Sequence, residues 1–556
     1  MKSRAAHHVQ HRSALAGGIN RRKFLGALGA VAAFGGSGLY SARSALAQRF
    51  VLSEENFGRM FPQLDPFFGD RPAKGLNAAL VELGKRGGVL DAGDALPASA
   101  DPAVQAQAAI NLIVNPDLSK NNPNNTTHTA GTTFMGQFMD HDMTFDQTSA
   151  LGDPTDPDDS PNTRSPTLDL DAVYLGGPGR SPQLYGHEGS RIKLKVGVLP
   201  GSGFEDLPRD EDGVAIIGDP RNDENIMLAG LHAAVLLFHN KAVDHVKARN
   251  RRGDDDEVFE EAQRLTRWHY QWMIVHEFLP LFIGQQRTSN ILRGRRFYRP
   301  RTAFMPVEFQ GAAYRFGHTM IRPSYRANRV GNPGSDPGAP AFFGMVFDPA
   351  GQGQADPVDL RGGGRQPRRF VGWETFFDFG LQEFAPGSGP AVKPNKLIDA
   401  KISTPLFLLP IQTIAGFDPD QPTPISLPAR NLLRGVTWSL PSGQSIARAI
   451  GADPLDPSEL PQFPSDFRLN RSTPLWPYCL QEGFVRAKGA TLGPVGGTIV
   501  GEVIIGLLEL DRRSYLAAES RWRPTLPQRD GKVTGDFRMV DFLTFAGVHP
   551  VPGRGA

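Results

Sequence analysis

Apolar residues at helical spacing recur along most of this chain, whereas the strict alternation typical of strands is scarce. Arg191–Leu199 is the best strand candidate. Helices are expected at Ala103–Ile113, Thr132–Phe145, Glu224–Lys247, Glu257–Ile283, Glu308–Met320, Pro428–Gly435, Ser442–Ile450, Pro474–Lys488 and Val495–Leu508. This pattern predicts a mainly α fold with little β structure.

The connections between these segments are rich in Gly, Pro and Asp, and the 556 residues include 62 Gly and 47 Pro. Length alone favours about three to four domains, but no loop has the length and polarity of a free linker. We therefore expect residues 48–556 to form one large helical domain with long ordered loops. A content of 40% hydrophobic residues excludes wholesale disorder. The single cysteine, Cys479, excludes a disulfide framework.

Residues 1–47 have the features of an export signal. The pair Arg21-Arg22 precedes an apolar run, Leu25–Tyr40, and Ala45-Leu46-Ala47 fits a small-residue cleavage site. The paired arginines resemble a twin-arginine signal, which is a bacterial export route. We expect cleavage after residue 47 and a bacterial protein that is periplasmic or secreted. An uncleaved membrane anchor is the alternative.

The charge of the remaining chain limits its partners. Without residues 1–47 the chain carries 53 basic and 58 acidic residues, a net charge of −5. Nucleic-acid binding needs a basic face that neutralises phosphates, so this balance argues against a nucleic-acid partner. We expect no stable membrane span after signal cleavage, and the oligomeric state is left open.

A polar cluster interrupts one of the apolar helical segments at Gly136–Asp142. Gln137, Asp140 and His141 are three and four residues apart and share one face of a helix. Asp142 is rotated by about 100° from His141 and serves a different site. The flanking Phe and Met residues indicate burial, and buried His and Asp side chains need partners or a ligand. A surface cluster or a metal site is the alternative.

Three further segments combine charged, amide and imidazole side chains. Arg221 and Glu224 stand just before the strongest helix, where an ordinary ion pair is the alternative. His318 follows a glycine, which leaves room for a flat group to approach. Asn431 and Arg434 share one helical face.

Taken together, these segments resemble the animal haem peroxidase family, also called the peroxidase–cyclooxygenase superfamily. They match it in identity, order and rough spacing, from about Ala103 to Leu508. The resemblance implies a single large, mainly α domain that binds haem b. It also implies hydrogen peroxide and a small reductant as partners.

On the distal side of the haem, the resemblance implies that His141 is the distal histidine. It would take a proton from the inner oxygen of peroxide and return it to the outer one. Arg221 would stabilise negative charge as the O–O bond breaks. Gln137 would hold a distal water or a halide.

On the proximal side, the resemblance implies that His318 is the axial ligand of the haem iron. Asn431 would accept a hydrogen bond from the far nitrogen of His318 and so orient the ring. Arg434 and Arg315 would lie near the haem propionates or support the proximal side.

The family attaches its haem through ester bonds from an Asp and a Glu, and Asp140 and Glu224 occupy those positions. The resemblance implies that peroxide turnover esterifies haem methyl groups to one or both. Asn225 follows Glu224 directly and the nearest methionine is Met227. The additional sulfonium link of myeloperoxidase is therefore not expected.

Oxygen-bearing residues alternate at positions 165–171, as in a loop wrapped round a hard cation. In the family such a loop joins the Asp after the distal histidine, so the resemblance implies a calcium site. Its ligands would be Asp142, Ser165, Thr167, Asp169 and Asp171. The family usually has Ser at the last position, so an Asp there changes the charge of the site. A loop of Asx-turns without a metal is the alternative.

The remaining helical histidines include two pairs, His232 with His239 and His269 with His276, each seven residues apart. A di-metal bundle would require Glu-x-x-His pairs from two helices. Glu224 and Glu277 do not stand three residues before a histidine. We therefore expect packing or hydrogen-bonding roles for these histidines.

The leading hypothesis is a haem peroxidase that oxidises halides, pseudohalides or small phenolic or organic donors. The rival is a haem-dependent fatty-acid dioxygenase or cyclooxygenase, enzymes that carry a tyrosine three residues before the proximal histidine. Here Arg315 holds that position, and Tyr314 is one residue off, which on helical geometry points its phenol to another face. A non-catalytic adhesion protein on a peroxidase scaffold is the third hypothesis. The retention of His141, Arg221 and His318 argues against it.

Overall fold

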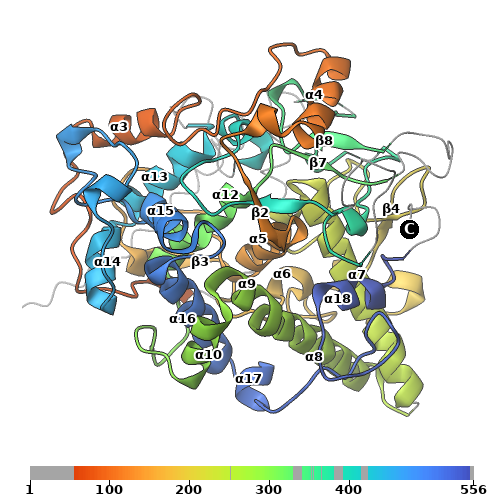
Figure 1. Cartoon of the computed structure of the whole chain (residues 1–556). Helices are drawn as coiled ribbons and strands as arrows, with labels where there is room; N and C mark the ends of the chain where they lie inside the picture. The colour runs from red at the N-terminus through yellow and green to blue at the C-terminus, as the bar shows by residue number, and fades with distance from the viewer. Residues whose placement is uncertain are drawn as a thin grey trace, which may run out of the picture. The chain divides into compact units, whose positions relative to one another are not determined.

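The computed structural model describes residues 55–550 except 251, 330–340, 352, 355, 365, 381–391 and 415–423. The expected signal segment and its cleavage after residue 47 lie outside the described residues and stay predictions. The described residues pack as one unit, in which helices are joined by long loops (Figure 1).

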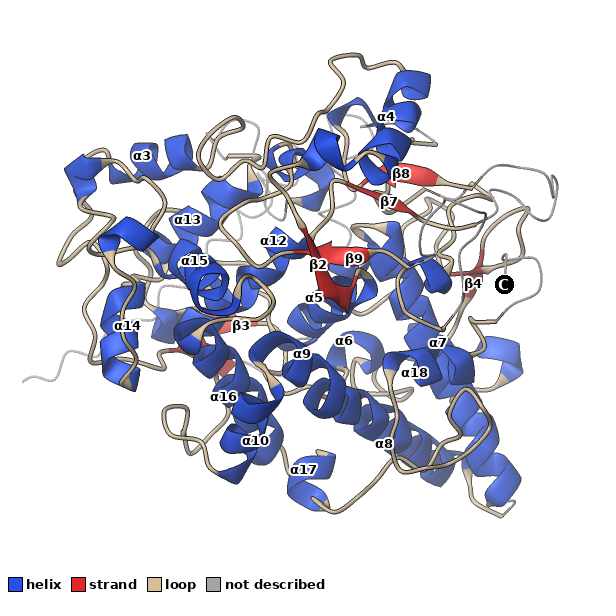
Figure 2. Cartoon of the chain, viewed as in Figure 1, coloured by secondary structure: helices blue, strands red, loops and turns tan. Residues whose placement is uncertain are grey.

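Helices dominate the architecture and the strands are short, as Figure 2 shows, so the mainly α prediction is confirmed. The helices are α3 (Leu76–Leu83), α4 (Pro102–Val114), α5 (Gly131–Met143), α6 (Asp171–Tyr174), α7 (Ile226–Arg249), α8 (Asp255–Met273), α9 (Leu279–Ile283), α10 (Gln285–Arg293), α11 (Val307–Gly311), α12 (Gly317–Met320), α13 (Leu427–Thr437), α14 (Gly443–Ile450), α15 (Leu475–Ala487), α16 (Pro494–Leu510), α17 (Tyr515–Ala518) and α18 (Met539–Ala546).

The described strands form small, separate sheets. They are β1 (Glu55–Gly58), β2 (Asn124–Thr129), β3 (Pro161–Asn162), β4 (Gly197–Val198), β5 (Glu205–Asp206), β6 (Met305–Pro306), β7 (Ser324–Arg326), β8 (Phe343–Met345) and β9 (Pro394–Lys396). Strand β1 pairs antiparallel with β3 and parallel with β6, and β2–β9, β4–β5 and β7–β8 are antiparallel pairs. The prediction of a strand over Arg191–Leu199 is wrong for most of its length, because only Leu194, in an isolated bridge to Tyr185, and Gly197–Val198, as β4, pair.

Two helices expected to be continuous are interrupted. The segment Glu257–Ile283 contains α8, one π-helical turn (Ile274–Phe278) and α9, which has a proline in its first turn. The segment Glu308–Met320 contains α11, a 3₁₀ turn η7 (Ala313–Phe316) and α12, because Ala312 leaves the helical region at φ −145° and ψ −70°. The prediction that Tyr314 points to another helical face assumed one continuous helix over this segment, and that assumption is wrong.

The side chain of Arg315, four residues after the end of α11 at Gly311, causes the break. In a continuous α-helix the carbonyl of Gln310 would accept a bond from the backbone N–H of residue 314. Here it accepts from Arg315 Nε at 2.7 Å. A half-buried guanidinium thus takes the place of a backbone donor, and the chain turns.

Helix α7 lies in the core. Its cap is Asn225, whose side chain accepts from Leu228 N at 2.9 Å. By length and composition alone α7 could cross a membrane, and among the described helices it is the one that meets this test. However, 83% of the apolar window is buried inside the protein, against α8, α18 and α5. Phe238 stacks on Phe542 with ring centroids 4.0 Å apart, which is the packing of a core helix.

Candidate active site

Helix α5 presents two polar faces. The helix ends at Met143 because Thr144 is extended, at φ −139° and ψ 136°. One face bonds through Gln137 and His141 to the segment that leads into α7. The other face carries Asp142, whose Oδ2 accepts from Leu170 N at 3.1 Å. This division is the one expected from helical spacing.

His141 is buried, with 5% of its surface exposed. Its Nδ1 lies 2.9 Å from Asn222 Oδ1. Burial, reinforced by the charge of Arg221, lowers the pKa of His141 to about 3. The ring is therefore neutral at physiological pH. When Nδ1 donates to Asn222, the Nε2 lone pair is a proton acceptor.

Arg221 pairs with Asp219, not with Glu224. Its Nε donates to Oδ1 at 3.0 Å and its Nη2 to Oδ2 at 2.7 Å. Burial alone would raise the pKa of Asp219, but Arg221 and Arg164 hold it well below its usual range. The ion pair is therefore fully charged in the interior.

Further contacts fix the plane of the Arg221 guanidinium. Nη2 also donates to the carbonyls of His141 and Thr144, at 3.2 and 2.6 Å. The guanidinium carbon lies 4.1 Å from the centroid of the Phe145 ring. None of these bonds uses Nη1, which is the nitrogen that can donate to a ligand.

The carboxyl group of Asp140 lies near enough to Glu224 to favour its protonated form. Burial, opposed by Arg221, raises the pKa of Glu224 to about 8, and burial raises the pKa of Asp140. Gln137 links this pair to α7: its Nε2 donates to Glu224 Oε2 and its Oε1 accepts from Asn225 Nδ2, both at 3.3 Å. Glu224 is therefore largely a neutral carboxylic acid at pH 7.

His318 lies in α12, which packs against α5. Burial, reinforced by Arg315, lowers the pKa of His318 to about 3, and a neutral imidazole is the form that binds metals. A Cβ on the preceding Gly317 would meet no atom within 4 Å. There is thus open space beside His318, as the glycine suggested.

The bond between His318 and Asn431 runs opposite to the expected direction. Asn431 Nδ2 lies 2.7 Å from His318 Nδ1, and Asn431 Oδ1 accepts from Arg315 Nη1 at 3.2 Å. Arginine has no acceptor atom, so it turns the amide oxygen toward itself. Ligation of iron through His318 Nε2 requires Nδ1 to donate, and hence requires this amide to turn over.

Three arginines, Arg315, Arg430 and Arg434, lie near one another beside His318. Burial, reinforced by Arg434 and then Arg430, lowers the pKa of Arg315 to about 10. Arg434 forms an ion pair with Asp146, with Nη1 and Oδ2 2.6 Å apart. This buried positive charge suits a dianionic group such as the two propionates of a haem. Together with the neutral His318, the donor set fits a haem.

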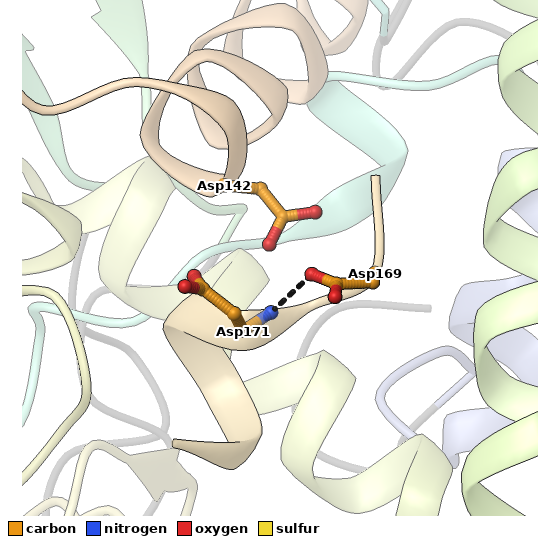
Figure 3. A group of neighbouring side chains, drawn as sticks. All are labelled: Asp142, Asp169 and Asp171. Atoms are coloured by element: carbon orange, nitrogen blue, oxygen red, sulfur yellow. Dashed lines mark hydrogen bonds between the residues drawn. The ribbon is translucent and has the colours of Figure 1, made fainter. Parts of the chain in front are cut away.

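Three carboxylates converge where α5 meets the loop before α6. Ligand atoms of Asp142, Asp169 and Asp171 lie within 4.8 Å of one another, and Figure 3 shows Asp142 directed toward the other two. Burial, with the neighbouring acids, raises the pKa of Asp142 well above its usual value and that of Asp171 to about 7. Asp142 Oδ1 and Asp171 Oδ1 are buried and have no hydrogen-bond partner among the described residues. This is a donor set that a hard cation would satisfy.

The two hydroxyl residues of the expected calcium set lie in the same loop. Ser165 Oγ and Thr167 Oγ1 are 2.8 Å apart and bond to each other. Ser165 N donates to Asp171 Oδ2 at 3.1 Å. Asp169 Oδ2 pairs with Arg513 Nη2 at 3.0 Å, so part of its charge is already balanced from the C-terminal region.

Sequence reasoning missed two residues of the site. Asp219 could have been found from the Asp-Pro start of a helical turn, because its Oδ1 accepts from Arg221 N at 3.0 Å. No local signal marks Asn222. The hydrogen-bonding role expected for His232 is realised as a bond to Asn222, with Nδ1 and Nδ2 2.9 Å apart. His239 likewise bonds to Tyr174 and to the carbonyl of Ile192.

Comparison with known proteins locates a family relationship in the middle of the chain. The model of the family described as animal haem peroxidase matches residues 147–386. Probable oxidoreductase PXDNL of Homo sapiens is 31% identical over 219 residues, which are 36% of this chain and 15% of that protein. Eosinophil peroxidase of Homo sapiens is 30% identical over 158 residues, 26% of this chain and 21% of that protein. The matches therefore span about a fifth or less of these relatives.

A solved structure extends the likeness to most of the chain at the level of the fold. The crystal structure of Oryza sativa fatty acid alpha-dioxygenase superposes with a TM-score of 0.51 and 15% sequence identity. The superposition covers 81% of this chain and 76% of the dioxygenase chain. At this identity the likeness concerns the fold alone.

Proposed function

We propose that the chain is a haem-dependent peroxidase, because residues 147–386 match the model of the animal haem peroxidase family. It reduces hydrogen peroxide and oxidises halides, pseudohalides or small phenolic or organic donors. One observation carries the proposal. Two neutral imidazoles, the buried His141 and the half-buried His318, lie on helices that pack together, and each has Nδ1 bonded to an asparagine.

Different residues would form the two sides of the haem. His318 would hold the iron, and Arg315 and Arg434 would face the propionates. When bound, the haem supplies the redox chemistry that cleaves the O–O bond and draws electrons from the donor. His141 Nε2 accepts the proton of the inner peroxide oxygen and returns it to the outer oxygen, so that water leaves. Arg221 Nη1 donates to the oxygen on which negative charge develops.

Gln137 completes the distal side. Its amide is already tied to Glu224 and Asn225 at 3.3 Å, a length at which the bonds exchange readily with a water or a halide. It therefore positions the small ligand that approaches His141.

Asp140 and Glu224 are the carboxyl groups that would form ester bonds with haem methyl groups. Peroxide supplies the two-electron oxidation: a methyl C–H and a carboxyl O–H are lost, a C–O bond forms, and two waters leave. A raised pKa keeps Glu224 in the carboxylic acid form. Mass spectrometry of the denatured holoprotein tests this step, because freely extractable haem after turnover rules the esters out.

Asp142, Asp169 and Asp171, with Ser165 and Thr167, would bind calcium. Support comes from the two buried carboxylate oxygens that have no hydrogen-bond partner in the described part of the chain. Calcium prefers six to eight oxygen ligands. Such an ion would tie α5 to the loop and so fix the helix that carries His141.

We also propose that the protein is exported through the signal at residues 1–47. The paired arginines, the apolar run and the Ala-Leu-Ala site support this placement. N-terminal sequencing of protein recovered from the periplasm or the medium tests it, and an intact N-terminus in a membrane fraction contradicts it.

Absorption spectroscopy followed by peroxide addition tests the catalytic proposal. The purified holoprotein is mixed with peroxide in the presence of bromide, iodide, guaiacol or a polyunsaturated fatty acid. Peroxide-dependent oxidation of a halide or of guaiacol is expected. A haem-loaded protein that oxidises none of them contradicts the proposal.

A fatty-acid dioxygenase is the second candidate, and Tyr314 favours it. Its hydroxyl donates to the carbonyl of Gly136 at 3.1 Å, one turn before His141 on α5. A phenol thus lies against the distal helix, although the residue three before His318 is Arg315. Oxygen uptake with the fatty acid alone, lost in Tyr314→Phe, would identify this activity in place of peroxidation.

A further inference from the structure

Three buried polar side chains stand in series, and His141, the proposed distal histidine, is the first of them. His141 Nδ1 lies 2.9 Å from Asn222 Oδ1, and Asn222 Nδ2 lies 2.9 Å from His232 Nδ1. Asn222 has 0% of its surface exposed and His232 has 1%. Water therefore does not compete for these bonds, and each side chain must satisfy the next.

An amide has an acceptor at one end and a donor at the other, so the series has a direction. With Oδ1 toward His141, the ring must donate from Nδ1 and its Nε2 carries a lone pair. With the amide reversed, His141 Nδ1 would accept, Nε2 would carry the hydrogen, and no acceptor would face the peroxide. The orientation of Asn222 therefore decides whether His141 can act as a base.

His232 selects the productive orientation. Once a proton reaches His141 Nε2, both ring nitrogens are donors, and only the amide oxygen of Asn222 can face Nδ1. The amide nitrogen must then find an acceptor, which is the lone pair on His232 Nδ1. Burial lowers the pKa of His232 to about 4, so this acceptor persists throughout the proton transfer.

The charges around His232 do not disturb this state. Asp219 and Asp223 act on its ring, and both would favour its protonation. Each is engaged by an arginine, Asp219 by Arg221 at 2.7 Å and Asp223 by Arg209 at 2.6 Å. Their negative charges are thus balanced by cations, and burial has the larger effect on the pKa of His232.

We propose that His232 is a positioning residue, which holds Asn222 so that its oxygen faces His141 and leaves His141 Nε2 free to accept the peroxide proton. This inference rests on the proposed peroxidase function and adds to it a residue that touches neither haem nor substrate. It predicts that His232, on α7, sets the tautomer of His141, on α5, through the single amide of Asn222.

The test uses holoprotein labelled with ¹⁵N-histidine, in the diamagnetic ferrous carbon monoxide form. Two-bond ¹H–¹⁵N correlations distinguish the Nδ1–H from the Nε2–H tautomer of His141. His232→Leu removes the acceptor, and His232→Asn restores an oxygen near the position of Nδ1. His239→Leu is the matched control, because His239 is buried on the same face of α7 and bonds to Tyr174 instead.

Wild type, His232→Asn and His239→Leu should all show the Nδ1–H tautomer of His141. His232→Leu should show the Nε2–H tautomer and react with peroxide at least about tenfold more slowly, with its Soret band unchanged. The proposal is overturned if His232→Leu keeps the Nδ1–H tautomer and the wild-type rate.

If His232→Leu yields no folded protein, Asn222→Leu breaks the series at its centre. It must show the same change of tautomer, and retention of Nδ1–H alone overturns the proposal. A wild-type holoprotein that does not react with peroxide defeats the proposed function instead. The tautomer result still decides the role of His232 in that case.

Discussion

Asp219 accepts two hydrogen bonds from Arg221 in the turn that precedes α7: Oδ1 accepts from Nε at 3.0 Å and Oδ2 accepts from Nη2 at 2.7 Å. The same carboxylate accepts from Arg164 Nε at 2.8 Å. One buried anion thus orients the cation that is proposed to act on peroxide. Asp219, two positions before Arg221 in the sequence, can therefore affect the proposed reaction with peroxide by orienting the Arg221 guanidinium.

Replacing this anion should affect both stability and rate. Removing one partner of a buried ion pair costs about 3 kcal/mol or more, so Asp219→Asn should lower the free energy of unfolding by that order. It should also slow the reaction with peroxide by about 10–100-fold, since Arg221 is no longer held. Denaturation and stopped-flow absorption measure the two effects.

Asp223→Asn is the matched control, because Asp223 is buried in the same turn but pairs with Arg209 at 2.6 Å. It should lose stability and keep the rate. Equal rates for the two variants would show that Asp219 has a structural role only.

Replacing each of the two proposed haem-facing histidines by alanine should affect the protein in a different way. His318→Ala should abolish normal haem ligation, seen as a lost or shifted Soret band. His141→Ala should keep the haem and slow the reaction with peroxide by about 10²–10⁴-fold, because the proton acceptor is gone. Wild-type kinetics in His141→Ala would show that the distal assignment is wrong.

Calcium should stabilise the protein through Asp142, Asp169 and Asp171. At a free concentration about a hundred times its Kd, a ligand contributes about 2.7 kcal/mol. For a chain of this size that raises Tm by about 3 °C. Thermal unfolding with calcium, with magnesium and with a chelator measures the effect, and the same Tm in all three contradicts the site.

Asp142→Asn should reverse the order of stabilities. Without calcium it removes one of three crowded carboxylates, so the variant should be at least as stable as wild type. With calcium it should be the less stable of the two. Asp256→Asn is the control, because Asp256 is exposed and pairs with Arg191; it should respond to calcium as wild type does.

The stability of the fold should depend on pH through Glu277, whose Oε2 accepts from Met539 N at 2.8 Å. Burial raises the pKa of Glu277 from 4.5 to about 7. The unfolded chain therefore loses this proton first, and the folded state is progressively disfavoured as pH rises from 4.5 to about 7.

Glu277→Gln keeps the acceptor and removes the titration. It should match wild type at pH 4.5 and exceed it by about 2 kcal/mol at pH 8. Chemical denaturation at both values measures the difference. Glu261→Gln, on the exposed side of α8 beside Arg264, should show no such dependence; a pH-independent gain for Glu277→Gln would assign the effect to packing.

Much of the candidate site was predictable because its signals are local. Gln137, Asp140 and His141 share a face through the repeat of the α-helix alone. Asp142 points to the other side for the same reason. Gly317 predicted open space beside His318, and the structure has open space at that position.

Other features were not predictable, since they depend on contacts between distant segments. The break at Ala312 arises because Arg315 takes the carbonyl of Gln310, and no periodicity reveals that competition. The same arginine reverses the amide of Asn431. The bond from His141 to Asn222 joins residues 81 positions apart.

The sequence by itself determined the helical class of the fold, the faces on which the reactive side chains stand and the family they resemble. Only the tertiary structure decided which carboxylate holds Arg221, which way each asparagine amide points and which histidine supports His141. Helical faces follow from a repeat of a few residues, whereas an ion pair or an amide orientation is set by neighbours brought together in a water-excluding interior.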